Sequence, residues 1–227
     1  MAGVISDPAL QAQIDALQAR SAAQEAETNS YFRDRAQKGD LSWDGLDDDA
    51  NRFMADKLVA LEPVKAEFCH MLCLALRARR VVEIGTSYGV STLYLADAVR
   101  QVCGPGGGVV IGTEYEPAKA AAARANFAAA GVADLIDLRE GDLRETLKVI
   151  EGPVDFVLMD IWTEMARPAI ELVGPHLRPG AIVVTDNTGE VFRHAYRHFF
   201  EYVNDPKNGL RTMTLPFNGG LELVVKV

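Results

Sequence analysis

The sequence predicts a doubly wound α/β fold: a mainly parallel sheet of seven strands that ends in an antiparallel hairpin, with helices at the N-terminus. From Arg80 onward, short runs of β-branched residues alternate with helical patterns of about a dozen residues, as in βαβ units. Near the C-terminus, two strand-like runs flank Asn218-Gly219, a strong hairpin signal. We expect a single domain, with an N-terminal helix and loop over 1–50, a helical lead-in over 51–79 and an α/β core over 80–227.

The N-terminal segment is predicted to be helical with one loop. A helix over 8–38 begins at Asp7-Pro8 and carries Leu10, Ile14 and Leu17 on one face. Residues 38–51 are acidic and lack periodicity, which indicates an exposed loop or a lid over the strand ends, and Asp48 or Asp49 is suited to cap a helix near Ala50. An apolar helix that begins at Pro63 is expected to pack inside.

The predicted strands are short and largely apolar, as buried parallel strands are. They are Val81–Ile84, Val109–Thr113, Leu135–Leu138, Val154–Met159 and Ala181–Thr185, followed by the hairpin strands Arg211–Pro216 and Leu221–Val227. The intervening helices are expected to begin near Ser91, Pro117, Leu143, Met165 and Val191.

The composition disfavours several classes of partner. Thirty-two acids against 23 bases give a formal net charge of −9, which repels nucleic acid. The N-terminal sequence lacks the pattern of a secretory signal, and no stretch is long and apolar enough to span a membrane. Three cysteines are too few for a disulfide framework. We therefore expect a cytoplasmic protein that acts without nucleic acid or membrane.

The candidate site residues follow the predicted strands, since ligands of open α/β sheets bind beyond the carboxyl ends of the strands. The first strand leads into a turn in which Gly85 and Gly89 permit close approach to a ligand, although the same glycines suit an ordinary strand-to-helix turn. Glu114 ends the second strand, where a carboxylate can accept both hydroxyls of a ribose. Asp142, after the third strand, is suited to contact an adenine amino group, to cap a helix, or both.

The glycine spacing distinguishes two classes of cofactor. A dinucleotide fold requires GxGxxG, which the run from Gly85 to Gly89 lacks, and Glu83 would place negative charge beside the phosphates. NAD is therefore disfavoured. Glu83 suits a cofactor with a cationic amino-acid end, and the run VVEIGTSYGVST resembles motif I of the class I S-adenosylmethionine-dependent methyltransferases, which have a Rossmann-like sheet.

Two further strand ends carry oxygen ligands. Asp160 ends the fourth strand and Asp186-Asn187 the fifth, and together they are suited to hold one hard cation such as Mg²⁺. Taken alone, Asp186-Asn187 is also typical of a structural turn.

In this order along the chain, the motifs resemble the catechol and caffeoyl-CoA O-methyltransferase family over about residues 55–227. The resemblance implies that the trio holds Mg²⁺ or another divalent ion, that Asp160 is catalytic and lies between cofactor and metal, and that Glu114 binds the ribose. The implied cofactor-binding residues are Glu83, Gly85, Thr86, Ser87, Gly89, Ser91, Glu114, Tyr115, Gly141, Asp142, Leu143, Asp160 and Trp162.

The sequence departs from this family at Thr163, where a lysine proposed as the base is common. A threonine cannot accept a proton at neutral pH, so the metal alone, a carboxylate or a different acceptor must compensate. We expect methyl transfer to a small-molecule hydroxyl, catechol-like, with Mg²⁺, by a homodimer. A metal-independent methyltransferase and a catalytically silent cofactor-binding module are the alternatives.

Overall fold

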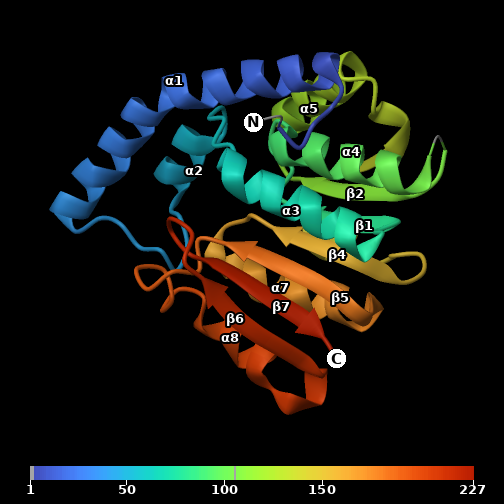
Figure 1. Ribbon diagram of the computed structural model, residues 1–227. Helices are drawn as coiled ribbons and strands as arrows, with labels where there is room; N and C mark the ends of the chain where they lie inside the picture. The colour runs from blue at the N-terminus through green and yellow to red at the C-terminus, as the bar shows by residue number, and fades with distance from the viewer. Residues whose placement is uncertain (1–2, 105) are drawn as a thin grey trace.

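The computed structural model describes residues 3–104 and 106–227 as one α/β unit (Figure 1). The helices are α1 (Pro8–Lys38), α2 (Asp48–Met54), α3 (Pro63–Leu76), α4 (Val90–Cys103), α5 (Pro117–Ala129), α6 (Leu143–Thr146), α7 (Thr163–Val173) and α8 (Arg197–Asn204). The strands are β1 (Arg80–Ile84), β2 (Val109–Glu114), β3 (Ile136–Glu140), β4 (Val154–Met159), β5 (Leu177–Asp186), β6 (Leu210–Leu215) and β7 (Leu221–Lys226).

The seven strands form a sheet in the order β3-β2-β1-β4-β5-β7-β6. The first five are parallel, and β7 pairs antiparallel with both β5 and β6. The strand order reverses between β1 and β4, and in such sheets the crevice at this reversal is where ligands bind. This topology confirms the predicted mainly parallel sheet with an antiparallel end.

Helices cover both faces of the sheet and bury two apolar cores. On one face, α1, α3, α4 and α5 pack against side chains such as Val81 and Phe156. On the other face, α6, α7 and α8 pack against the alternate residues of the same strands, such as Val82 and Val157. Successive residues of a strand point to opposite faces, so a central strand buried on both sides must be apolar throughout.

The predicted elements agree with the structure except at three places. Asp47 caps α2 through its side chain, rather than Asp48 or Asp49. β5 begins four residues earlier than expected, at Leu177. The helix expected near Val191 begins only at Arg197, because residues 191–196 form successive turns.

The apolar stripe of α1 packs within the chain itself. Leu10, Ile14 and Leu17 are buried in the core that α1 shares with α4. Figure 1 shows the C-terminal half of α1 extending beyond the sheet before the chain returns to α2. An exposed apolar stripe on α1 would have supported the predicted homodimer. Because the stripe is covered within the chain, dimerisation stays a prediction that the resemblance alone supports.

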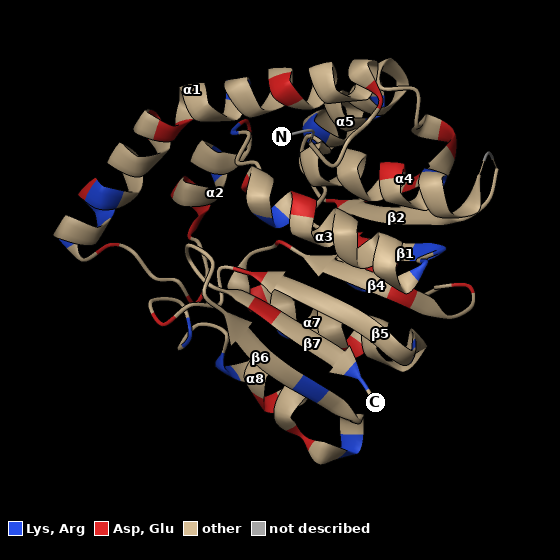
Figure 2. Ribbon diagram, in the orientation of Figure 1, with Lys and Arg blue, Asp and Glu red and all other residues tan. Residues whose placement is uncertain are grey.

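Within the described residues, none of the helices combines the length and apolarity needed to cross a membrane. Acidic and basic residues are interspersed along the ribbon in Figure 2, and acids outnumber bases 32 to 23.

Candidate functional site

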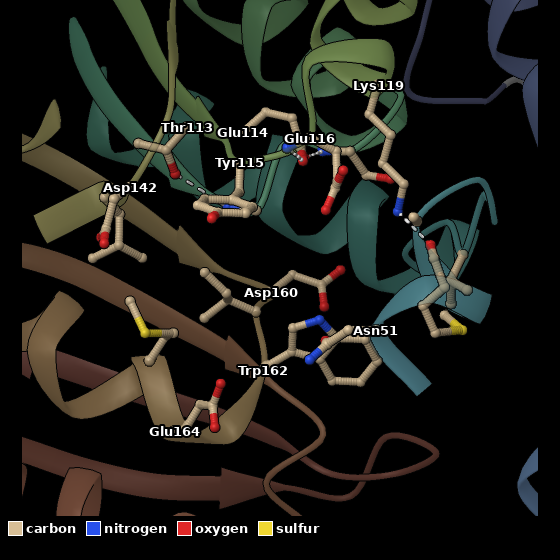
Figure 3. A pocket seen from close by; sticks show the side chains of 18 of the residues that line it. Asn51, Thr113, Glu114, Tyr115, Glu116, Lys119, Asp142, Asp160, Trp162 and Glu164 are labelled. Atoms are coloured by element: carbon tan, nitrogen blue, oxygen red, sulfur yellow. Dashed lines mark hydrogen bonds between the residues drawn. The ribbon is translucent and has the colours of Figure 1, made fainter. Parts of the chain in front are cut away.

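A cavity of about 550 Å³ opens at the carboxyl ends of the parallel strands. Ten of the site residues predicted from sequence line it: Gly85, Ser87, Glu114, Tyr115, Gly141, Asp142, Leu143, Asp160, Trp162 and Asn187. Figure 3 shows Asp160 lying centrally between Glu114 and Trp162. The end of the sheet chosen from the sequence is therefore the one that carries the cavity.

A much smaller hollow adjoins this cavity and shares Gly85, Ser87 and Asp160 with it. Its lining adds two further predicted residues, Thr86 and Ser91. The turn after β1 thus borders both hollows, and its assignment to the methionine part of a cofactor stays a prediction.

The glycines of this turn are required by contacts within the protein. Gly85 has a φ of +96°, and a Cβ added there would lie 2.0 Å from the carbonyl oxygen of Asp160. Gly89 has a φ of +87°, and its added Cβ would lie 2.3 Å from the ring of Phe127. Gly85 lines the cavity, whereas Gly89 packs on the ring in the core. Packing against Phe127 is sufficient to require glycine at position 89, and the predicted approach of Gly89 to a ligand stays a prediction.

Glu114 is held by the backbone on both carboxylate oxygens. Oε2 accepts from the backbone N–H of Ser87 at 2.7 Å, and Oε1 accepts from that of Glu116 at 2.8 Å. Each carboxylate oxygen has a second lone pair, so both can also accept from a ligand in the cavity. These bonds fix the carboxylate at the place where a ribose is expected.

Glu83 is fully buried and lines neither hollow. One oxygen, Oε2, accepts from the hydroxyls of Thr86, at 2.9 Å, and Thr92, and the other has no hydrogen-bond partner in the described residues. Burial raises the pKa of Glu83 to about 7, against the hydrogen bonds of these hydroxyls, which lower it. Its predicted contact with a cationic cofactor end remains a prediction.

On the side assigned to adenine, Asp142 is bonded to other residues of the protein, whereas two aromatic side chains are exposed. Asp142 caps α6 through the backbone N–H of Arg144 and forms an ion pair with the guanidinium of the same residue. Its capping role is thus observed. Tyr115 is 70% exposed and Trp162 38% exposed, although both line the cavity. Such exposed aromatic faces are available to stack on a planar ligand.

The three predicted metal ligands lie at neighbouring strand ends, with a fourth polar residue among them. The ammonium of Lys65, from α3, donates to Asp186 Oδ1 at 2.7 Å. The other oxygen, Oδ2, accepts from the side-chain amide of Asn187 at 3.3 Å. No group of three or more His, Cys, Asp or Glu suited to a metal was found among the described residues.

The carboxyl groups of this cluster titrate abnormally. Burial, and then the nearby charges of Asp186 and Glu83, raise the pKa of Asp160 to about 8. Burial also raises the pKa of Asp186, while the hydrogen bond from Lys65 opposes that shift. Like-charged carboxylates this close favour a neighbouring cation.

Sequence reasoning missed the residues that reach the site from other elements. Asn51, Met54 and Lys57 form the α2 side of the cavity, and Lys119 of α5 donates to the carbonyl of Met54 at 2.9 Å. Lys65 could have been suspected, because it shares a helical face with Cys69 in a helix expected to be buried, and a buried lysine needs an acidic partner.

At Thr163 the sequence departs from the family pattern, and the side chain of this residue is bonded to a neighbouring loop. Its hydroxyl donates to the backbone carbonyl of Trp43 in the loop between α1 and α2. The same loop forms an ion pair between Asp44 and Arg197, and the Trp43 ring packs edge-on against Phe192, with centroids 5.0 Å apart. The acidic loop is therefore attached to the α7 side of the sheet end.

Comparison with known proteins gives consistent matches. A family described as a methyltransferase domain matches residues 82–188. The chain is 38% identical over 130 residues to a catechol O-methyltransferase of Mycobacterium tuberculosis, covering 57% of each chain. It is 31% identical over 137 residues to a catechol O-methyltransferase of Niastella koreensis, covering 57% of this chain and 58% of that one.

Solved structures agree. The cofactor-bound Rv0187 protein of MTB superposes with a TM-score of 0.67 at 30% identity, over 78% of this chain and 86% of that one. The O-methyltransferase TomG of Streptomyces achromogenes, in complex with SAM, gives 0.66 at 25% identity over the same shares.

The sheet, the cavity at its switch point and these matches define a class I S-adenosylmethionine-dependent methyltransferase fold. Within this class, the chain carries a methyltransferase domain over residues 82–188 and is similar to O-methyltransferases, two of which are named catechol O-methyltransferases. The alignments span less than two thirds of the curated relatives, 57% and 58% of their length.

Proposed function

We propose that this protein transfers the methyl group of S-adenosylmethionine to a hydroxyl of a small molecule. The observation that carries the proposal is the cavity that joins Glu114 to Asp160 and Asn187 at the switch point of the sheet. Glu114 would accept from the ribose hydroxyls, Tyr115, Leu143 and Trp162 would border the adenine, and the turn after β1 would hold the methionine part. Catechols are the first acceptors to test, because two curated relatives are named for them.

The chain's residues would contribute mainly by positioning. Glu114 and the turn after β1 would hold the cofactor at two points, so that the methyl group it supplies and an acceptor bound in the same cavity would be brought together without the entropy cost of a bimolecular encounter. Asp160 lies in the wall between the two hollows and would orient both partners. The loop that carries Trp43 would exclude water from the acceptor side.

The sequence predicts a divalent ion on Asp160, Asp186 and Asn187. When bound, such an ion would orient the acceptor oxygen and favour its ionisation. Two carboxylates and an amide oxygen are suitable ligands, but the cluster already contains the Lys65 ammonium, and the Asn187 amide presents its nitrogen to Asp186. In this arrangement the residues do not fit a divalent ion.

Calorimetry with S-adenosylmethionine and S-adenosylhomocysteine tests the proposal first. We expect saturable binding of both, followed by production of S-adenosylhomocysteine when a panel of catechols and other hydroxyl compounds is added. Absence of cofactor binding would refute the proposed function. Binding without turnover on any acceptor would favour a catalytically silent cofactor-binding module.

A further inference from the structure

Lys65 is the feature of the sheet end that the family resemblance leaves unexplained. Its side chain is 2% exposed, although it carries a full charge, and it is one of the largest fully buried side chains in the described chain. Buried lysines are rare, because an ammonium loses its hydration and must regain hydrogen bonds and a negative partner inside the protein. Its nearest partner is Asp186 at 2.7 Å, and Glu62 follows at 3.8 Å.

The position of Lys65 conflicts with a divalent ion shared by Asp186 and Asn187. An ion would need an oxygen from each residue on the same side. Asp186 Oδ1 already accepts from Lys65, and its Oδ2 faces the amide nitrogen of Asn187. Asn187 Oδ1 instead lies toward Gly219, where an added Cβ would be 3.0 Å from it and 3.9 Å from the Lys65 nitrogen.

The backbone around the pair is also fixed. Asn187 has a φ of +57°, which few residues other than glycine adopt, and the Tyr196 hydroxyl donates to the carbonyl oxygen of Asp186 at 3.1 Å. Asn187 lines the cavity, whereas Lys65 and Asp186 are buried and do not line it. The Lys65 ammonium, by fixing the position of Asp186, therefore also fixes Asn187, the adjacent residue that faces the cavity.

We propose that the Lys65 ammonium supplies the positive charge that this site needs at Asp186, and that methyl transfer by this protein consequently requires no divalent cation. The inference rests on the proposed function. Lys65 is a positioning residue: it neutralises Asp186, keeps the Asp186-Asn187 turn in place and repels a second cation.

The first test measures metal binding without any acceptor. Mn²⁺ is titrated into the wild-type protein in the presence of S-adenosylhomocysteine and followed by electron paramagnetic resonance. We expect no saturable site below about 1 mM, a range in which a carboxylate site for a hard cation normally fills. Saturable binding at micromolar Mn²⁺ that disappears in Asp186→Asn would overturn the proposal.

Two variants test the role of the charge. Lys65→Met keeps much of the side-chain volume but removes the ammonium, so we expect Mn²⁺ to bind at least about tenfold more tightly than in the wild type, since the ion replaces a lost charge. Lys65→Arg keeps the charge and should bind Mn²⁺ no better than the wild type. The matched control is Lys148→Met, which removes an exposed lysine paired with Glu145 and should leave Mn²⁺ binding unchanged.

Weaker or unchanged Mn²⁺ binding by a folded Lys65→Met would instead make Lys65 an orienting partner of a metal ligand, and would refute the proposal. Should Lys65→Met fail to fold, the wild-type titration and Lys65→Arg still decide, because neither removes the buried charge.

Turnover provides the second readout. With an acceptor from the panel, we expect the wild-type kcat to change by less than about twofold in EDTA, and Lys65→Met to lose turnover in EDTA and regain part of it with Mg²⁺. Loss of wild-type activity in EDTA, restored by Mg²⁺, would refute the inference while leaving the proposed function intact. Failure to bind S-adenosylmethionine would refute the proposed function, and the Mn²⁺ titration would still report on Lys65.

Discussion

At the scale of single residues, Glu114 is the clearest test of the cofactor assignment. Its carboxylate accepts backbone N–H groups on both oxygens, so Glu114→Gln turns an amide NH₂ toward one of these donors and removes the charge. A charged hydrogen bond contributes about 1.5–3 kcal/mol, so we expect the Kd for S-adenosylmethionine to rise about ten- to a hundredfold. Calorimetry measures this Kd. The control is Glu140→Gln, because Glu140 is an exposed acid at the end of β3 and lies outside the cavity. Unchanged affinity would remove the ribose assignment.

Glu83 gives a prediction about pH. Its pKa is about 7 in the folded protein and about 4.5 when solvated. Below pH 4.5 both states are protonated; as pH rises toward 7, the unfolded state loses its proton first, so the free energy of unfolding falls. The fall attributable to Glu83 is at most about 3 kcal/mol.

In Glu83→Gln this part of the pH dependence should be absent. Urea unfolding of the wild type and the variant at pH 5 and pH 8 measures this pH dependence. The free energy of unfolding should fall less across this interval in the variant than in the wild type. Parallel stability profiles would show that Glu83 is ionised throughout the interval.

The residue scale also shows where sequence reasoning stops. The acids at strand ends were predictable, because the topology of a parallel sheet brings these ends together. The partner of Asp186 was not, since Lys65 is 121 positions away and its burial depends on how α3 packs against the sheet. Likewise, the need for Gly89 became visible only with the ring of Phe127 beside it.

At the scale of elements, periodicity located nearly every strand, since central strands buried on both faces are apolar throughout. It was wrong for residues 191–196, where Val191, Phe192 and Tyr196 have helical spacing but the chain forms turns. There, Phe192 packs on Trp43 and Tyr196 donates to Asp186, so tertiary contacts outweigh a local pattern.

The loop between α1 and α2 provides a prediction at this scale. Its attachment includes the hydrogen bond from Thr163 to the carbonyl of Trp43, and Thr163→Val removes this bond at nearly constant volume. We expect amide hydrogen exchange in residues 39–47 to accelerate several-fold, and the KM for the acceptor to rise while cofactor affinity stays constant. Thr146→Val is the control, because the Thr146 hydroxyl has no hydrogen-bond partner among the residues that the structure describes. Unaltered exchange in the loop would mean that the other contacts suffice to hold it.

At the scale of the whole molecule, the question is whether α1 belongs to the core of one chain or to an interface between chains. Ile14 is 1% exposed and contributes to the core on the α4 side of the sheet. Truncation of a buried isoleucine to alanine costs about 2–5 kcal/mol, through lost burial and the cavity that remains. The apolar stripe of α1 would support the predicted homodimer only if its side chains were accessible to a second chain.

We therefore expect Ile14→Ala to lower the Tm by the same amount at low and high protein concentration, because the lost contacts lie within one chain. A melting temperature set by association between chains would instead depend on concentration. Light scattering at micromolar concentration should give the same mass for variant and wild type, whatever that mass is. Val191→Ala, a truncation at a side chain 78% exposed, should change stability by less than about 0.5 kcal/mol. A variant with half the mass of the wild type, or a Tm loss that vanishes at high concentration, would instead place the α1 stripe at a subunit interface and support the predicted dimer.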